Sequence, residues 1–257
     1  MAAENVTSID KALTIMESIS HTGGESTLHE IYLETQIPKS TIKRILETLI
    51  QREYVKQIER SGVYQLGVNV LVLGGVYQKN MNVRGIAFPF MKSLSKELNE
   101  TVNLNVVDNG ERVCVEVIEP IRDIRHFVSI GHRSELYRGS TGKAMLAFLQ
   151  EFTQEKVIAK AAQDSINVNV LRKELQIINK NGYAITRGER IRESFSVSAP
   201  VFNQNGEMIA GLTVSGPIQR LTREREPDII ASVIVAAKEV SRQLGYQKSN
   251  RRENYVN

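Results

Sequence analysis

Apolar residues recur at three- and four-residue spacing in three short segments near the start of the chain, residues 8–20, 27–35 and 38–49. This spacing places them on one side of a helix, so each segment is expected to form a short amphipathic helix. Thr27 and Glu30 form a capping-box pattern at the start of the second segment. Pro38 suits the first turn of the third, where its missing N–H leaves no bond unmade.

Two short alternating runs, residues 54–58 and 63–66, follow the third predicted helix. Such alternation predicts two strands, and the turn residues between them predict a hairpin. Helix, helix, tight turn and helix make a helix-turn-helix, and the hairpin adds a wing. The first 66 residues are therefore expected to be a winged helix-turn-helix domain.

The outward side of the third predicted helix is basic and rich in hydroxyl groups, which suits a reader of the DNA major groove. The residues predicted to contact DNA are Lys39, Ser40, Thr41, Lys43 and Arg44, together with Arg60 at the hairpin tip. Arg44 can pair bidentately with guanine, and Ser40 and Thr41 would join it at base edges. The lysines and Arg60 are expected to hold phosphates. Taken alone, the helix fits a solvated surface helix better, and the wing reverses that preference.

The net charge of the 257-residue chain is +4, which favours a polyanionic partner only weakly. Residues 1–84 hold nine Lys and Arg against nine Asp and Glu, so the segment with the DNA-reading helix is neutral. A single neutral domain with one such helix would bind DNA weakly. Recognition is therefore expected to depend on the symmetric pairing of two helices in an oligomer.

Residues 66–80 are apolar and are expected to form a linker helix. Gly74 and Gly75 together weaken helix propensity by roughly 1–2 kcal/mol, which favours a bend or a close contact there. Apolar surface between two domains is typical of a contact with another subunit.

From residue 86 onward the pattern alternates between the helical and the strand period, which predicts a mixed α/β domain. Helical periodicity marks residues 86–98, 171–178 and 230–244. Strand alternation marks residues 101–107, 112–119, 125–130, 197–202 and 208–215. A further helix is expected to run to Leu149 from Thr141 as its N-cap.

Residues 139–144 (Gly-Ser-Thr-Gly-Lys-Ala) fail as a phosphate-binding loop, because two residues instead of four separate the glycines and Ala144 follows the lysine. The start of a helix with free N–H groups and flanking hydroxyls is instead suited to a carboxylate. Lys143 fits a solvated or structural lysine better than a ligand-binding one.

Several classes of protein do not fit the sequence. Because Cys114 is the single cysteine, the chain cannot form an intramolecular disulfide. Cys114 is interpreted as a small residue of a strand rather than as a nucleophile. The four histidines lack metal-ligand spacing, so no metal and no cofactor are expected. No apolar run approaches the roughly 20 residues that span a bilayer, and residues 1–10 lack the apolar region of a secretory signal. A cytoplasmic location without a membrane partner is expected.

Short segments spread over nearly the whole chain resemble, in order and spacing, the IclR family of bacterial transcriptional regulators. In the first half they are residues 8–13 (SIDKAL), 37–46 (IPKSTIKRIL), 64–67 (YQLG) and 101–104 (TVNL). In the second half they are residues 142–147 (GKAMLA), 181–184 (NGYA), 198–201 (SAPV) and 214–217 (VSGP).

This resemblance implies an α+β protein in which a winged helix-turn-helix is joined by a linker helix to a GAF-like effector-binding domain. The sheet of that domain is expected to be mostly antiparallel. The expected boundaries are 1–66, 67–84 and 85–247, followed by a flexible tail, residues 248–257. The resemblance also implies homodimers or tetramers on palindromic operator DNA. The expected function is that of a ligand-responsive repressor.

By the pattern of the family, the effector pocket would be lined from three places in the second domain. Its expected residues are Ser140, Thr141, Gly142, Ser194, Ser196, Thr213 and Ser215. Their hydroxyls favour a small polar effector such as an organic or sugar acid. Arg138 stands where many relatives carry a small residue or a histidine, and it could add a carboxylate partner. Arg187, Arg190 and Arg192 lie near the pocket, where a surface loop explains them equally well.

Two other functional classes remain open at this stage. An oligomeric signalling adaptor with a vestigial DNA-binding domain would fit the neutral N-terminal domain. A small-molecule enzyme fits less well, because the sequence offers neither a nucleophile–base pair nor an intact phosphate loop, and no enzymatic activity is expected.

Overall fold

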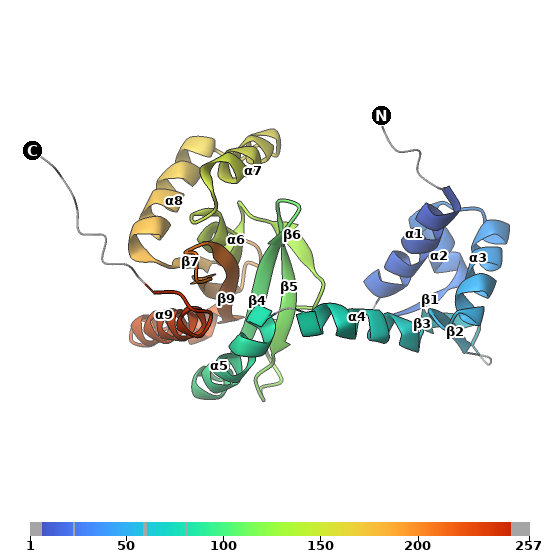
Figure 1. Cartoon of the computed structure of the whole chain (residues 1–257), viewed down its shortest axis with the longest axis horizontal. Helices are drawn as coiled ribbons and strands as arrows, with labels where there is room; N and C mark the ends of the chain where they lie inside the picture. The colour runs from blue at the N-terminus through green and yellow to red at the C-terminus, as the bar shows by residue number, and fades with distance from the viewer. Residues whose placement is uncertain (1–6, 23, 59–60, 81, 248–257) are drawn as a thin grey trace, which may run out of the picture. The chain divides into compact units, whose positions relative to one another are not determined.

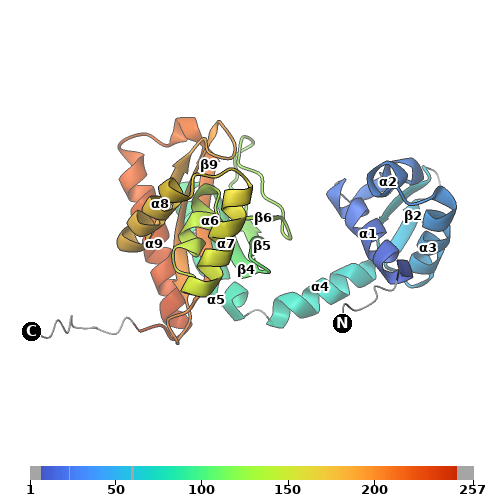
Figure 2. The same ribbon diagram turned by 90° about the horizontal axis from the view of Figure 1, so that it is seen from above.

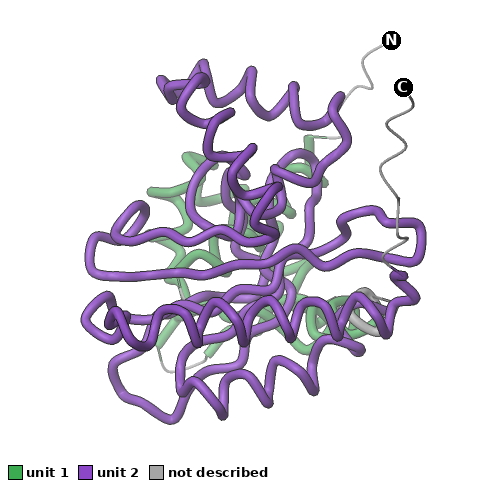
Figure 3. The backbone as a smooth tube through the Cα atoms, turned by 90° about the vertical axis from the view of Figure 1, so that its left-hand side faces the viewer, with its two compact units in different colours: residues 1–80 green, residues 81–257 purple. Residues whose placement is uncertain are grey.

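The computed structural model describes residues 7–22, 24–58, 61–80 and 82–247. The chain divides into two compact units, residues 1–80 and 81–257 (Figure 3). Arg60 and the predicted tail, residues 248–257, fall outside the described residues. Each unit has its own hydrophobic core.

The first unit is a winged helix-turn-helix, as predicted (Figure 1). Its helices are α1 (Thr7–His21), α2 (Leu28–Thr35) and α3 (Lys39–Gln51), and its strands are β1 (Glu25–Thr27), β2 (Val55–Ile58) and β3 (Val63–Leu66). The strands form one antiparallel sheet in the order β1-β3-β2. The sequence did not reveal β1, because its three residues end in the capping box of α2.

The three helices pack through branched side chains that recur at helical spacing. The fully buried ones are Ile15, Ile19, Ile31, Ile42 and Leu46. The capping box of α2 is confirmed: the Thr27 hydroxyl accepts the Glu30 N–H, and the Glu30 carboxylate accepts the Thr27 N–H at 2.7 Å. The sequence placed Pro38 in the first turn of α3. Pro38 is instead the N-cap, one position earlier, because its ψ of 134° is not helical.

Helix α4 (Val68–Asn80) follows β3 and passes through Gly74 and Gly75 without a break. A Cβ at either glycine would have no atom of the described residues within 4 Å, so the chain itself supplies no close contact there. Most apolar side chains described in α4 are exposed: Val68, Leu71, Val72, Leu73 and Val76, with Leu71 exposed by 74%. No helix in the described ranges is long and apolar enough to cross a membrane.

The second unit is built on a six-stranded antiparallel sheet in the order β6-β5-β4-β9-β8-β7. Its strands are β4 (Thr101–Asp108), β5 (Glu111–Ile118), β6 (Arg133–Glu135), β7 (Ala184–Arg187), β8 (Ser194–Phe202) and β9 (Met208–Pro217). The predicted antiparallel sheet of an α+β fold is thereby confirmed. Strand β7 is an edge strand that the sequence pattern did not reveal.

Helices cover both faces of this sheet (Figures 1 and 2). On one face lie α5 (Asn82–Leu98) and α9 (Arg225–Gln243), which bury a core with apolar residues of β4, β8 and β9. On the other face lie α6 (Gly139–Leu146), α7 (Glu151–Gln163) and α8 (Val168–Asn181), around a second core. A 3₁₀ turn, η1 (Ile218–Arg220), connects β9 towards α9.

The strand predicted for residues 125–130 is wrong. Residues 119–132 form an irregular loop, and the sixth strand is β6 beyond it. The loop is held at separate points: the Thr101 hydroxyl donates to the His126 carbonyl at 2.6 Å, and the Gly131 N–H donates to the Cys114 carbonyl at 2.7 Å. His126 and Val128 are half-buried between exposed neighbours, so the alternation in the sequence reflects the two sides of an extended loop segment rather than a hydrogen-bonded ladder.

A buried carboxylate joins the ends of several elements of the second unit. Glu100, which is fully buried between α5 and β4, accepts two hydrogen bonds of 2.7 Å from Arg220 and one of 3.0 Å from Arg225. Arg220 also donates to the Ile124 carbonyl in the 119–132 loop. A Cβ at position 216 would lie 2.4 Å from a Glu100 oxygen, so Gly216 provides the space for it. We call Glu100, Arg220 and Arg225 the Glu100 cluster.

Glu100→Gln should destabilise the protein by about 3–5 kcal/mol, because it leaves two guanidinium groups without their shared counter-ion. Chemical unfolding followed by far-UV circular dichroism measures this loss.

Glu155→Gln is the matched control. Glu155 also accepts a bidentate pair from one arginine, Arg172, but both side chains are exposed. Solvent screens that pair, so the variant should unfold near the parent midpoint. Equal losses in the two variants would contradict the structural role assigned to the Glu100 cluster.

Candidate functional site

The outward face of α3 carries the side chains that the sequence assigned to DNA. Lys39, Ser40, Lys43 and Arg44 are exposed, and Thr41 is half-buried at the edge of the face. Ile42 and Leu46 lie on the opposite side in the core, so the helix has the expected two unlike faces. These five positions follow one another along the first two turns of α3.

The basic groups of this face are available to a partner. Within the described residues, Lys39, Lys43 and Arg44 form no ion pair, and the Lys39 ammonium lies 5.4 Å from the centre of the Tyr32 ring. Solvated cations on a helix that presents its N-terminal half can approach phosphates without first breaking a contact. Arg60, the sixth residue predicted to contact DNA, lies outside the described residues.

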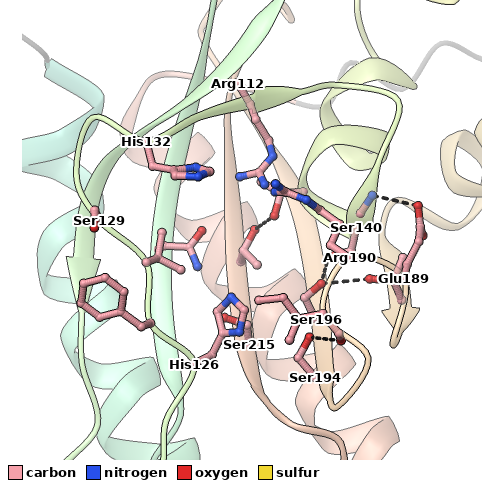
Figure 4. A pocket seen from close by; sticks show the side chains of 18 residues that line it. Arg112, His126, Ser129, His132, Ser140, Glu189, Arg190, Ser194, Ser196 and Ser215 are labelled. Atoms are coloured by element: carbon pink, nitrogen blue, oxygen red, sulfur yellow. Dashed lines mark hydrogen bonds between the residues drawn. The ribbon is translucent and has the colours of Figure 1, made fainter. Parts of the chain in front are cut away.

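In the second unit, a cavity of about 300 Å³ opens beside the start of α6 (Figure 4). Its walls come from the central strands, from the 119–132 loop and from the loop of residues 188–193 between β7 and β8. Six of the seven residues expected from the sequence line it: Ser140, Thr141, Ser194, Ser196, Thr213 and Ser215. We call it the polar cavity.

Strand alternation explains why one face of the sheet is polar here. Leu104, Val197 and Val214 point into the core under α5 and α9. The residues next to them in the strands, such as Asn105, Ser198 and Thr213, point to the other face, where α6 begins. Three neighbouring strands thus place amide and hydroxyl groups side by side.

The hydroxyls of the polar cavity bond to one another. Ser140 Oγ lies 2.7 Å from both Ser196 Oγ and Ser198 Oγ, and Thr141 Oγ1 lies 2.9 Å from Thr213 Oγ1. Ser198, which the sequence reasoning omitted, links the two pairs through a 2.8 Å contact with Thr213. These mutual bonds fix the walls of the cavity and satisfy most of its hydroxyls.

Ser215 is the exception among these hydroxyls. It is 2% exposed, and its Oγ has no hydrogen-bond partner among the described residues. A buried hydroxyl without a partner costs free energy that a bound polar group would recover. The Ser215 hydroxyl is therefore available to form a hydrogen bond with a polar atom of a ligand.

Two glycines near the start of α6 have distinct roles. Gly139 has a φ of +72°, and a Cβ there would lie 3.0 Å from Cδ of Arg190, whose stem crosses it. Gly142, which was expected to line the site, instead packs against backbone, because a Cβ would lie 2.6 Å from the Leu136 carbonyl oxygen. Thr141 is not the N-cap of α6, because the helix begins at Gly139 after Arg138.

Two arginines that the sequence reasoning did not assign to the site give the polar cavity its charge (Figure 4). Arg112 of β5 is 8% exposed; its Nη1 donates to Asn105 Oδ1 at 3.1 Å, and its Nε has no partner in the described structure. Burial, followed by the charge of Arg190, lowers the pKa of Arg112 to about 10. Arg112 thus remains a cation at neutral pH. Arg190 belongs to the 188–193 loop.

Two histidines of the 119–132 loop line the same cavity. Burial, followed by the charges of Arg190 and Arg112, lowers the pKa of His126 and of His132. Both imidazoles are consequently neutral near pH 7, because burial and the positive field both disfavour protonation. An anion placed among these four groups would weaken that field.

The protein's own carboxylate already occupies the start of α6. Glu189 accepts the Gly139 N–H at 3.0 Å and the Lys143 ammonium at 3.0 Å, and Glu174 accepts Lys143 at 2.8 Å. Burial alone lowers the pKa of Lys143, but its bonds to Glu174 and Glu189 outweigh burial and raise it. Lys143 is therefore structural, and the predicted free N–H groups are in part used internally.

Neither the cysteine nor the acidic and histidine side chains described in the second unit indicate a reactive or metal-binding site. Burial raises the pKa of the Cys114 thiol to about 11, so it stays protonated and is a poor nucleophile. The described residues contain no group of three or more His, Cys, Asp or Glu side chains that could hold a metal ion.

Comparison with known proteins identifies both parts of the chain. The family model described as "IclR helix-turn-helix domain" matches residues 8–59, and the one described as "Bacterial transcriptional regulator IclR C-terminal" matches residues 75–242. The HTH-type transcriptional regulator KipR of Bacillus subtilis is 34% identical over 169 residues, which cover 63% of this chain and 68% of that protein. The transcriptional repressor IclR of Escherichia coli is 28% identical over 95% of this chain and 92% of its own.

Solved structures agree with these matches. The crystal structure of Thermotoga maritima IclR superposes with a TM-score of 0.77 at 27% identity, covering 94% of this chain and 100% of that one. An IclR regulator from Alicyclobacillus acidocaldarius shares the fold, with a TM-score of 0.80 at 24% identity and the same coverage. With an exposed basic helix face in one unit and a polar cavity in the other, the chain belongs to the IclR family of DNA-binding, effector-responsive transcriptional regulators.

Proposed function

We propose that the protein is a repressor that binds palindromic operator DNA as a homo-oligomer and releases it on binding a small organic or sugar acid. The observation that carries the proposal is the polar cavity, in which two arginines without carboxylate partners among the described residues face hydroxyl-lined walls. In this proposal residues 1–66 bind DNA, residues 67–84 link the domains, and residues 85–247 bind the effector in the cytoplasm.

The residues of α3 support the DNA-binding part of the proposal. Arg44 reaches base edges with Ser40 and Thr41, and Lys39 and Lys43 hold phosphates. Because residues 1–84 carry equal numbers of basic and acidic side chains, a single copy has little general attraction to DNA. Two copies that present α3 to successive major grooves supply the missing affinity, and the exposed apolar side of α4 offers surface for their association.

Repression is proposed because the E. coli relative that matches nearly the whole chain is described as a transcriptional repressor. The acid nature of the effector follows from Arg112 and Arg190, since guanidinium groups bind carboxylates with paired hydrogen bonds. Release requires that the acid bind one arrangement of the two units more tightly than the other.

An adaptor that no longer binds DNA is the second candidate, and the neutral N-terminal unit is the observation that favours it. The two candidates differ in their salt dependence. A repressor that neutralises phosphates loses affinity steeply as salt rises, and an adaptor has no such affinity to lose.

Arg44→Ala should weaken binding to the operator by roughly 1–3 kcal/mol, because it removes a base-edge contact from α3. The operator is first selected from a random DNA library with the full chain, and affinities are then measured at several salt concentrations. Arg52→Ala is the control, an exposed arginine of the same charge at the opposite end of α3. Equal losses in both variants would remove Arg44 from the reading face, and failure to select any DNA would favour the adaptor.

Ser215→Val should abolish stabilisation by an acid effector while changing the melting temperature of the free protein little, because its hydroxyl bonds to no described residue. Thermal shift with a panel of small organic and sugar acids provides the measurement, since a ligand that binds only the folded state raises Tm. Ser196→Val tests the neighbouring position on β8, which pairs with Ser215 in the sheet. If the acid stabilises both variants as much as the parent, it binds elsewhere.

The stability of the free protein should fall on mild acidification because of His126 and His132. Their folded pKa values lie below the ordinary value of about 6.5, so below that pH the unfolded chain binds more protons than the folded one. The free energy of unfolding, measured from about pH 7.5 to about pH 5.5, should decrease less in the double variant His126→Gln/His132→Gln. A parallel decrease in parent and variant would show that other groups dominate.

A further inference from the structure

We infer that the ligand of the polar cavity is a small dicarboxylic acid, whose two negative charges balance Arg112 and Arg190. This inference rests on the proposed function and specifies the chemical class of its effector. It depends on three features: an unpaired buried cation, a second cation on the facing loop, and the internal use of the nearby carboxylates.

Arg112 supplies the buried end of the site. Among the described residues its guanidinium makes one hydrogen bond, to Asn105, whose amide in turn donates to Asn103 Oδ1 at 2.7 Å. This chain fixes the direction of the guanidinium but brings no negative charge. Its unpartnered Nε and the unpartnered Ser215 hydroxyl are both buried at the wall of the same cavity. A buried cation without a counter-ion is costly, and a carboxylate would relieve that cost.

Arg190 supplies the second positive charge. Its aliphatic stem crosses Gly139, and its residue is largely exposed, so it lies at the side of the cavity that opens to solvent. Arg112 and Arg190 approach the cavity from different elements, β5 and the 188–193 loop (Figure 4). The two guanidinium groups are close enough that the charge of Arg190 lowers the pKa of Arg112. One carboxylate would neutralise half of this combined charge.

The acidic groups nearby are engaged elsewhere. Glu189 lines the cavity, but its two oxygens accept the Gly139 N–H and the Lys143 ammonium. Glu174 also bonds to Lys143. Glu135 acts on Arg112 only through space, and in the described part of the chain neither Arg112 nor Arg190 forms an ion pair. The second negative charge must therefore come with the ligand.

The size of the cavity limits the carbon chain. A volume of about 300 Å³ is at the lower end of ligand pockets, which suits a short diacid rather than a drug-sized molecule. Phe127, Val128 and Ile191 add apolar surface to the lining of the cavity. A short methylene chain between two carboxylates could lie against that surface.

The test compares each diacid with its own half-amide, which has nearly the same size and one charge less. Binding of succinate, glutarate and adipate, and of succinamate, glutaramate and adipamate, is measured by calorimetry with the full chain near neutral pH. At least one diacid should bind about tenfold or more tightly than its half-amide, because the half-amide leaves one guanidinium unpaired.

Arg190→Gln should remove this preference, so that the diacid and its half-amide bind equally. Arg192→Gln is the matched control, because Arg192 is an exposed arginine of the same loop that does not line the cavity. The control should keep the parent preference. Arg112→Gln should weaken both members of the pair, but Arg112 is buried, so the exposed Arg190 decides the result if that variant does not fold.

Four outcomes would overturn the inference. If every half-amide binds as tightly as its diacid, or if a monocarboxylate from the acid panel is the tightest ligand, the effector has one acidic group and the proposed function stands. If glycerol 3-phosphate binds more tightly than every diacid, the double charge belongs to a phosphate. If no acid of either kind binds or stabilises the chain, the proposed acid-sensing function itself fails.

Discussion

The second unit depends on the burial of one carboxylate. Glu100 has no contact with water, and two arginines that are distant in the sequence supply its counter-charge. Through them the end of α5, the start of α9 and the 119–132 loop are fixed to one point. That loop is also a wall of the polar cavity, so the geometry of the binding site rests on an ion pair that never touches a ligand.

The same unit uses arginine in two opposite ways. In the Glu100 cluster both guanidinium groups bond to one buried carboxylate, and their role is to hold loops together. In the polar cavity Arg112 and Arg190 have no carboxylate partner within the described residues, and the folded state bears the cost of keeping them near each other. Unsatisfied charge in an otherwise satisfied domain is a common sign of a functional site, because selection for stability alone would pair or remove it.

The sequence predicted the features that depend on the local spacing of residues. Helical periodicity and the capping box placed α2 and α3, and the hydroxyl positions of β8 and β9 follow from strand alternation. It missed what depends on tertiary contacts. Arg112 lies in a correctly predicted strand, yet its charge matters only because Arg190, far along the chain, folds over Gly139. The alternation of Asn103, Asn105, Ser196 and Ser198 with apolar neighbours was visible, and it would have indicated a polar sheet face.

Gly139 links the shape of the backbone to the range of sequences that can keep this cavity. Its positive φ disfavours any side chain, and the stem of Arg190 occupies the space where a Cβ would stand. A substitution at 139 thus both strains the turn and displaces the arginine. A shorter residue at 190 would remove the steric conflict with a Cβ at 139 but would leave the strain in the turn. Position 190 of this chain can consequently accept other residues without straining the turn, whereas position 139 cannot.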